Sequence, residues 1–235
     1  MKKVLIAIVA LMAVTFSAQA QKVTFSKDAN LAFGSKVFFV EPISYLGYGA
    51  HILRGAETPG IKGGYSNEFF VNIMELGIRP TKTIMFALGV DYNLDHYRLD
   101  KEHVWGADSD NGTVWSNSLS MTKFKEVRYS RLNVHTFAIP VSFEVRANKG
   151  AFRIGAMGEY NLPAVVKNKG VTADGVSKNR TTGITTNEFT YSFFAALSYG
   201  GLGVYGKYSP AFQFADGIGP RFNAITIGAV LGLGM

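Results

Sequence analysis

A two-residue alternation between large apolar side chains and small or polar ones is the feature that most constrains this chain. A β-strand points successive side chains to opposite faces, so this period indicates strands with one apolar and one polar face. The clearest example is segment 151–164, where Phe152 and Ile154 alternate with Arg153 and Gly155. Three further segments repeat the pattern: 84–95, 189–198 and 225–234. The alternation therefore predicts an all-β fold.

Turn signals divide the chain into eight predicted strands, at residues 36–52, 66–80, 84–100, 126–146, 151–166, 187–200, 202–214 and 221–235. Tight turns at 80–83, 147–150 and 200–201 alternate with longer, polar connections at 53–65, 101–125, 167–186 and 215–220. Each segment exceeds the ~9 to 11 tilted residues that cross a bilayer. We therefore predict an eight-stranded, up-and-down antiparallel transmembrane β-barrel with short periplasmic turns and longer extracellular loops. Because segment 113–125 is also β-compatible, we expect the long strands to extend beyond the membrane as a ribbon.

The N-terminus has the pattern of a secretory signal peptide. Lys2 and Lys3 precede an apolar run over 4–16, and a small-x-small motif ends at Ala20. We therefore predict a signal peptide over 1–20, cleavage after Ala20, and one domain over 21–235. The apolar run is shorter than the ~20 residues of a membrane-spanning helix, and no later run approaches that length.

A secreted, soluble β-barrel or sandwich is the alternative fold that alternation leaves open. A soluble barrel carries dense charge on its outer face, whereas only 17% of this chain is charged and its polar faces are rich in Gly, Ala and Ser. Aromatic residues also lie near the ends of the predicted strands, as in the girdles of a membrane barrel: Phe38, Phe39, Tyr45, Tyr48, Tyr92, Tyr97, Tyr160, Tyr199, Tyr208, Phe212 and Phe214. These features favour the cell outer membrane as the location.

The composition excludes several functional classes. The chain has no cysteine, which excludes disulfides, thiolate metal ligands, a thiol nucleophile and the acylated cysteine of a lipoprotein. The formal net charge of +7 falls to +5 without Lys2 and Lys3, and no clustered basic helix accompanies it. Nucleic acid is therefore not expected as a partner. The positive charge favours outer-membrane lipid and lipopolysaccharide instead, and no cofactor is expected.

One stretch resembles a known family. Residues 137–143 read FAIPVSF and are followed by AFRIGA at 151–156 and GEY at 158–160. An aromatic-x-Ile-Pro strand, a short turn and a glycine-spaced strand in this order resemble the PorT-like outer-membrane β-barrel family of Gram-negative bacteria. The resemblance implies an eight-stranded outer-membrane barrel that the barrel assembly machinery inserts. Many outer-membrane barrels end in Phe, whereas this chain ends in Met235, which bears on the details of insertion.

Charged residues recur on the face that is predicted to line the lumen: Glu75, Arg79, Asp91, Asp95, Glu144, Arg146, Arg153, Glu159 and Lys207. Eight strands leave only enough interior space for side chains to fill. Because an unpaired buried charge is very costly, we predict that these residues form a network of charge pairs that plugs the lumen. A proton or ion path is the alternative that the same charges leave open.

The four histidines are interpreted as solvated loop residues: His51, His96, His103 and His135. Asp95, His96 and His103 lie near Asp100 and Glu102, but their spacing matches no established metal motif, so no metal site is predicted. Trp105 and Trp115 flank a turn signal at Asn111-Gly112. These two rings could contact glycan, protein or lipid, or could pack together at a hairpin tip.

One predicted strand carries the residue types of a catalytic set. Ser130, His135 and Glu126 supply a nucleophile, a base and an acid. Residues five apart on a strand point to opposite faces unless a bulge intervenes, so no catalytic residue is predicted. Pro140 in this strand cannot donate a ladder hydrogen bond. The face pattern around it predicts a bulge near His135 and Thr136, with a locally unpaired ladder position as the alternative.

These observations predict a non-enzymatic outer-membrane barrel with a structural or surface-interaction role. A narrow porin or transport-associated channel is the first alternative. An outer-membrane enzyme that acts on lipids is the second.

Overall fold

The computed structural model describes residues 31–33, 36–54, 66–99, 103–108, 112–117, 126–172, 175–214 and 221–233. The predicted signal peptide lies outside these ranges. The described residues are strands joined by turns, and none of them belongs to a helix long and apolar enough to cross a membrane.

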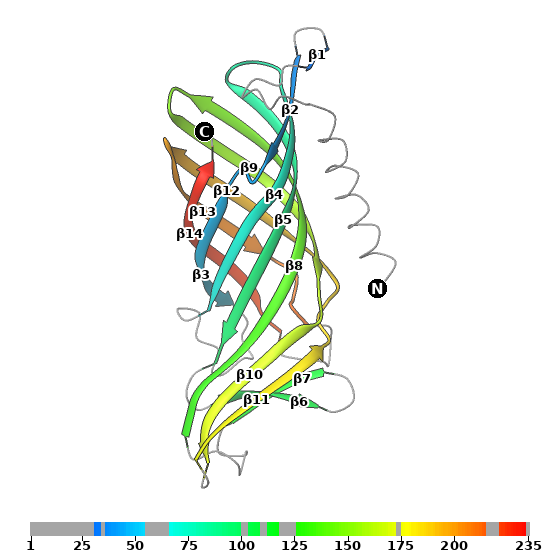
Figure 1. Ribbon diagram of the computed structural model, residues 1–235, viewed down its shortest axis with the longest axis vertical. Coiled ribbons are helices and arrows are strands. Elements are labelled where there is room, and N and C mark those ends of the chain that lie inside the picture. Colours follow the sequence, from blue (N-terminus) through cyan, green and yellow to red (C-terminus); the bar gives the residue numbers. More distant parts are fainter. Residues whose placement is uncertain are drawn as a thin grey trace.

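Eight strands form a closed ring (Figure 1): β3 (Leu46–Arg54), β4 (Asn67–Arg79), β5 (Ile84–Arg98), β8 (Glu126–Ala147), β9 (Gly150–Asn161), β12 (Phe189–Tyr199), β13 (Gly201–Ser209) and β14 (Asn223–Leu233). Each strand pairs antiparallel with the next in this order, and β14 pairs with β3 to close the ring. The prediction of a closed, eight-stranded, up-and-down barrel is therefore confirmed.

Three tight turns connect strands at one end, which we call the turn end. The connection after β4 is closed by the Thr81 hydroxyl oxygen, which accepts hydrogen bonds from the backbone N–H groups of Thr83 and Ile84. The β8–β9 turn contains Asn148 at φ 54°, and Gly200 begins the β12–β13 turn at φ 60°. Asn and Gly tolerate this left-handed conformation better than other residues. All three turns lie where the sequence predicted them.

The predicted strand 36–52 is interrupted. It consists of β2 (Lys36–Pro42) and β3, which lie end to end along β4, and Ile43 between them has φ 49°. β2 pairs with residues 74–79 of β4, whereas β3 pairs with residues 67–71. Because only β3 also pairs with β14, β2 leaves the ring and forms a short extension with β1 (Leu31–Phe33) at the turn end.

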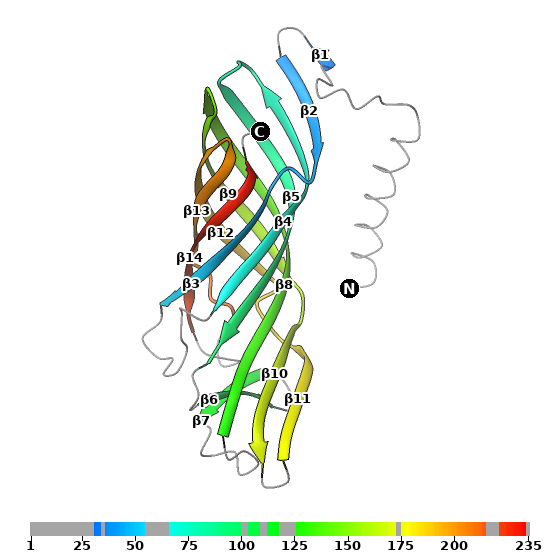
Figure 2. The same ribbon diagram turned by 60° about the vertical axis from the view of Figure 1, so that its left-hand side comes forward.

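The opposite end, which we call the loop end, carries a three-stranded extension (Figure 2). It consists of residues 126–133 of β8 together with β10 (Ala164–Thr172) and β11 (Gly175–Ile184). We call this extension the ribbon. The predicted loop at 167–186 is therefore wrong, because these residues are mostly strand. β6 (His103–Asp108) and β7 (Gly112–Asn117) form a separate hairpin within the predicted loop 101–125.

Side chains alternate between the interior and the outer surface of the barrel. On β5, Phe86 and Leu88 are exposed on the outside, whereas Met85, Ala87 and Asp91 are buried inside. The predicted face assignments of β5, β9 and β12 are confirmed. On β14 the alternation shifts at its end, where Gly232 has φ 94° and Leu233 points inward.

The predicted bulge in β8 is wrong. β8 pairs with β5 in one continuous register from Phe137 to Arg131, and Val134 is buried inside the barrel. Val134 points inward because it belongs to an apolar cluster that fills the loop end of the barrel. The cluster consists of Tyr97, Leu99, Leu132, Val134, Ala164, Val166, Ile184, Phe214 and Phe222. At Pro140, which has no N–H to donate, the pairing with β5 skips Gly89 and Val90 and resumes in the same register.

Candidate functional site

The barrel interior contains a charged cluster around Arg153 in β9. The Arg153 guanidinium donates from Nε to Glu144 Oε2 at 2.6 Å, and from Nη1 and Nη2 to the two oxygens of Glu75 at 2.5 and 3.1 Å. The Arg153 residue is 2% exposed, and both carboxylates are buried. Arg146 adds a second cation, which also contacts Glu144. The planar guanidinium thus joins β4, β8 and β9 across the lumen with the bidentate geometry that arginine favours.

Asp91 lies beside this cluster and is held by neutral groups. Asn72 Nδ2 donates to Asp91 Oδ1 at 2.7 Å, and the Tyr45 hydroxyl donates to Asp91 Oδ2 at 3.4 Å. The Tyr45 ring in turn lies 5.2 Å from the Arg153 guanidinium, within the range of a cation–π contact. Among the described residues Asp91 makes no ion pair, although the Arg153 charge acts on it through space.

A second charged cluster lies around Lys207 in β13. The Lys207 ammonium contacts Glu68 and lies 3.8 Å from Glu159 Oε1. Glu159 also accepts hydrogen bonds from Ser192 at 2.8 Å and from Thr190 at 2.9 Å. Lys207, Glu68 and Glu159 are all buried, so their charges depend on one another and on these hydroxyl groups for stabilisation.

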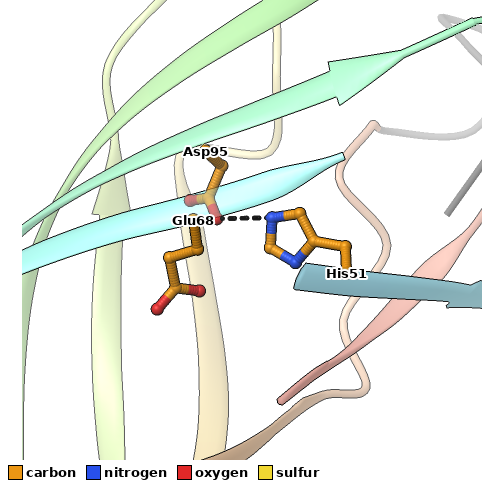
Figure 3. A group of neighbouring side chains, drawn as sticks. All are labelled: His51, Glu68 and Asp95. Atoms are coloured by element: carbon orange, nitrogen blue, oxygen red, sulfur yellow. Dashed lines mark ion pairs between the residues drawn. The ribbon is translucent and has the colours of Figure 1, made fainter. Parts of the chain in front are cut away.

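His51 extends the Lys207 cluster toward the seam between β3 and β14, and Figure 3 shows it beside Asp95 and Glu68. Its Nε2 lies 3.1 Å from Asp95 Oδ1, and its Nδ1 lies 2.9 Å from the Thr226 hydroxyl. One ligand atom each from His51, Glu68 and Asp95 lie within 4.8 Å of one another, so these three residues could hold a metal ion. The Lys207 ammonium contacts Glu68 and already supplies a positive charge there.

Two small cavities lie beside the charged clusters. One cavity of about 30 Å³ lies between Tyr45, Phe70, Arg153 and Lys207, and another of about 20 Å³ lies between His51, Glu159 and Gln213. A cavity needs ~10 to 15 Å³ to hold one water molecule, so each has room for one or two waters. Side chains fill most of the remaining interior, as expected for eight strands.

The predicted lumen residues separate into two groups. The structure buries seven inside the barrel: Glu75, Asp91, Asp95, Glu144, Arg153, Glu159 and Lys207. Arg146 is half-buried beside Glu144. Arg79 lies at the edge between β2 and β4, where it pairs with Glu41 at 3.2 Å and covers the Phe39 ring at 4.4 Å.

Two members of the interior network were missed by the sequence reasoning. His51 was predicted to be solvated, but it is 1% exposed, so that prediction is wrong. His51 shares a strand face with Gly47 and Gly49, opposite to the face of Tyr48, and this alternation indicates an inward position. Glu68 was not assigned to the lumen because its parity differs from that of Glu75. The β4–β5 register shifts between Asn72 and Met74, and this bulge brings both glutamates inside.

The other candidate residues do not assemble into a site among the described residues. Ser130 is buried inside and donates to Asn168 at 2.6 Å, whereas His135 lies on the outer face, 2.5 Å from the Tyr92 hydroxyl. His96 contacts Asn67 at 3.1 Å. The Glu126 and His103 side chains lie outside the described residues, so the catalytic set and the alternative metal group are not placed. Trp105 and Trp115 pair in the β6–β7 ladder, and their side chains also lie outside the described residues.

No protein-family model matches the chain, and no curated protein matches it. Its function is therefore inferred from the distribution of apolar and charged side chains in the barrel.

Proposed function

We propose that this chain is a non-enzymatic outer-membrane β-barrel protein of a Gram-negative bacterium, with a structural or surface-interaction role. One observation carries this proposal: the barrel exposes large apolar side chains and buries charged ones. Exposed examples are Phe86, Ile139, Val141, Phe152, Phe193, Leu197 and Val204, and they come from five different barrel strands. Exposing such a surface to water would cost free energy, whereas the hydrocarbon of a bilayer would solvate it.

The height of the apolar surface supports a membrane location. On β5 the outward side chains are apolar or aromatic from Phe86 to Leu94. Nine residues span ~27 Å along a strand, and a tilt of ~40° reduces this to ~20 Å along the membrane normal. Tyr92, Tyr160 and Phe189 lie toward the loop-end limit of this surface, where aromatic side chains face the membrane–water interface. We call this surface the apolar belt.

Export by the predicted signal peptide and insertion by the barrel assembly machinery belong to the same proposal, as does membership of the PorT-like family. The orientation follows from the connections: the turn end faces the periplasm, and the loop end with its ribbon faces the cell exterior. We found no assembled nucleophile and base among the described residues that would favour a lipid-acting enzyme.

Orientation can be tested with single cysteines, because the natural chain has none. We expect Asn179→Cys in the ribbon to react with a membrane-impermeant maleimide on intact cells. Lys149→Cys in the β8–β9 turn should react only after the outer membrane is opened. Both positions are exposed, so accessibility of the side chain itself is matched. Labelling of Lys149→Cys alone on intact cells would reverse the proposed orientation.

A closed lumen is the second part of the proposal. The buried ion pairs and the cavities of about 30 and 20 Å³ support an interior with no continuous water column. The purified protein should therefore show little or no steady conductance in planar bilayers, measured beside an established open porin under the same salt and voltage. Stable, ion-selective channels from the unmodified protein would contradict this part and favour the narrow porin instead.

A further inference from the structure

A row of cationic side chains runs in direct register from barrel strand β5 across the three strands of the ribbon. Arg98 of β5 pairs with Arg131 of β8, Arg131 pairs with Lys167 of β10, and Lys167 pairs with Arg180 of β11. In the next row toward the tip, Lys169 pairs with Lys178 and with Tyr129. We call the four residues of the first row the basic row.

The basic row lies on the outer face of the ribbon. Val166 and Asn168, which alternate with Lys167 along β10, are buried on the inner face, and Val166 belongs to the apolar cluster. Directly opposed residues on antiparallel strands share a face, so the four cations lie on the side opposite to Val166. This outer face continues the lipid-facing surface of the barrel.

The basic row has no counter-charge among the described residues. None of its four side chains forms an ion pair with a described Asp or Glu. The Nε atoms of Arg98 and Arg131 are buried and have no hydrogen-bond partner in the part of the chain that the structure describes. Like charges directly opposite one another destabilise a sheet, and a buried guanidinium N–H without an acceptor is costly. Both features call for an external anion between the strands.

The position of the row identifies the kind of anion. Leu94 is the last residue of the apolar belt on β5, and Arg98 lies four residues beyond it. This spacing places Arg98 ~13 Å further along the strand and ~10 Å further along the membrane normal. Headgroup layers add ~5 to 8 Å to each side of the hydrocarbon, and an arginine or lysine side chain reaches back to this layer. The Arg98 end of the row therefore faces the depth at which lipid phosphates lie.

We infer that the basic row binds phosphate groups of anionic lipid headgroups in the leaflet around the loop end. This inference rests on the proposed membrane location and adds a specific lipid-binding site to it. Guanidinium groups fit phosphate oxygens with two parallel hydrogen bonds, and the lysine ammonium adds a point charge between the two arginines beside it. Bound phosphate relieves the repulsion within the row and supplies acceptors to the guanidinium groups.

The test uses the full-length protein in micelles of an uncharged detergent. We expect the protein to bind added lipid A, which carries phosphate, in preference to phosphatidylcholine, as measured by native mass spectrometry or by titration. The double variant Arg131→Gln/Lys167→Gln should bind lipid A on the order of 10- to 100-fold more weakly. The matched control Lys82→Gln/Lys149→Gln loses the same charge at the exposed turn end and should bind as the unmodified protein does.

Three outcomes would overturn the inference. Equal weakening in both double variants would show a general charge effect. Unchanged binding in Arg131→Gln/Lys167→Gln would show that the row is not the site. Displacement of lipid A by millimolar inorganic phosphate or by soluble polyphosphate would assign the row to a soluble anion instead.

A separate measurement distinguishes failure of this site from failure of the membrane proposal. Both double variants and the unmodified protein should insert equally into vesicles of phosphatidylcholine and float with them in a density gradient. Flotation without selective lipid A binding would defeat the lipid-binding site alone. Absence of flotation for the unmodified protein would defeat the membrane location on which the site depends.

Discussion

Val141→Arg is expected to prevent stable assembly of the barrel. Val141 lies on the outer face of β8 within the apolar belt and is 59% exposed. An arginine on the lipid face near the bilayer midplane costs ~2 to 4 kcal/mol, whereas the same change on a water-exposed surface costs little. The folded fraction after refolding into vesicles can be measured from heat-modifiable migration in gels, and stability from urea titration.

The control is Val176→Arg in the ribbon. Val176 is 53% exposed, so the two sites match in residue type and accessibility, but Val176 lies beyond the apolar belt. We expect Val176→Arg to assemble as the unmodified chain does. Equal tolerance of arginine at both sites would mean that water surrounds the whole barrel, and the membrane proposal would then fail.

Arg153→Met is expected to destabilise the barrel by ~3 to 5 kcal/mol. Removing the guanidinium leaves Glu75 buried without a cation among the described residues, whereas Glu144 keeps only its contact with Arg146. Methionine retains much of the side-chain volume, so the loss of charge is separated from the creation of a cavity. Urea unfolding in lipid vesicles measures the change in the free energy of unfolding.

A second substitution tests the pairing itself. In Arg153→Met/Glu75→Gln the unpaired carboxylate is replaced by an amide, and part of the lost stability should return. Glu188→Gln on an Arg153→Met background serves as a control, because Glu188 is exposed and forms no ion pair among the described residues. No loss of stability in Arg153→Met would indicate that water reaches this side chain and that the lumen is open.

Much of the barrel could be predicted because the side chains on its outer surface differ strongly from those in its lumen. The alternation of Phe152 and Ile154 with Arg153 specifies an inner and an outer face, and tight turns such as Asn148-Lys149 fix where strands reverse. Together these signals gave the number of strands, the face of each central strand and most of the buried charges.

The ribbon could not be predicted in the same way. Residues 167–186 are rich in Lys, Asn, Thr and Gly, a composition that is typical of loops. Their strand structure depends on pairing with the long N-terminal part of β8. Local composition does not predict a tertiary contact of this kind. The aliphatic Val165, Val166 and Val171 were a weak local signal that polar neighbours obscured.

Register irregularities explain the remaining errors at the site. A single bulge in β4 exchanges the inner and outer faces, so Glu68 and Glu75 point inward although their parities differ. In β8 the reverse error occurred, because inward Leu132 and Val134 were attributed to a bulge. The apolar cluster at the loop end shows that apolar residues also belong on the inner face where the lumen is capped.

The seam between β3 and β14 is expected to form late in folding. Its pairs run from Leu46 with Leu231 to Arg54 with Asn223. Inside the barrel, a side-chain hydrogen bond across the seam joins His51 and Thr226, 175 residues apart in the chain. Contacts of such sequence separation form slowly, since the entropy of closing the loop is lost before the contact is gained. Until they form, β3 and β14 each present a row of unpaired backbone groups, which invites association between chains. Among the described strands, only the closing of this seam covers the two edges, so we expect protection against aggregation before closure to come from outside the chain.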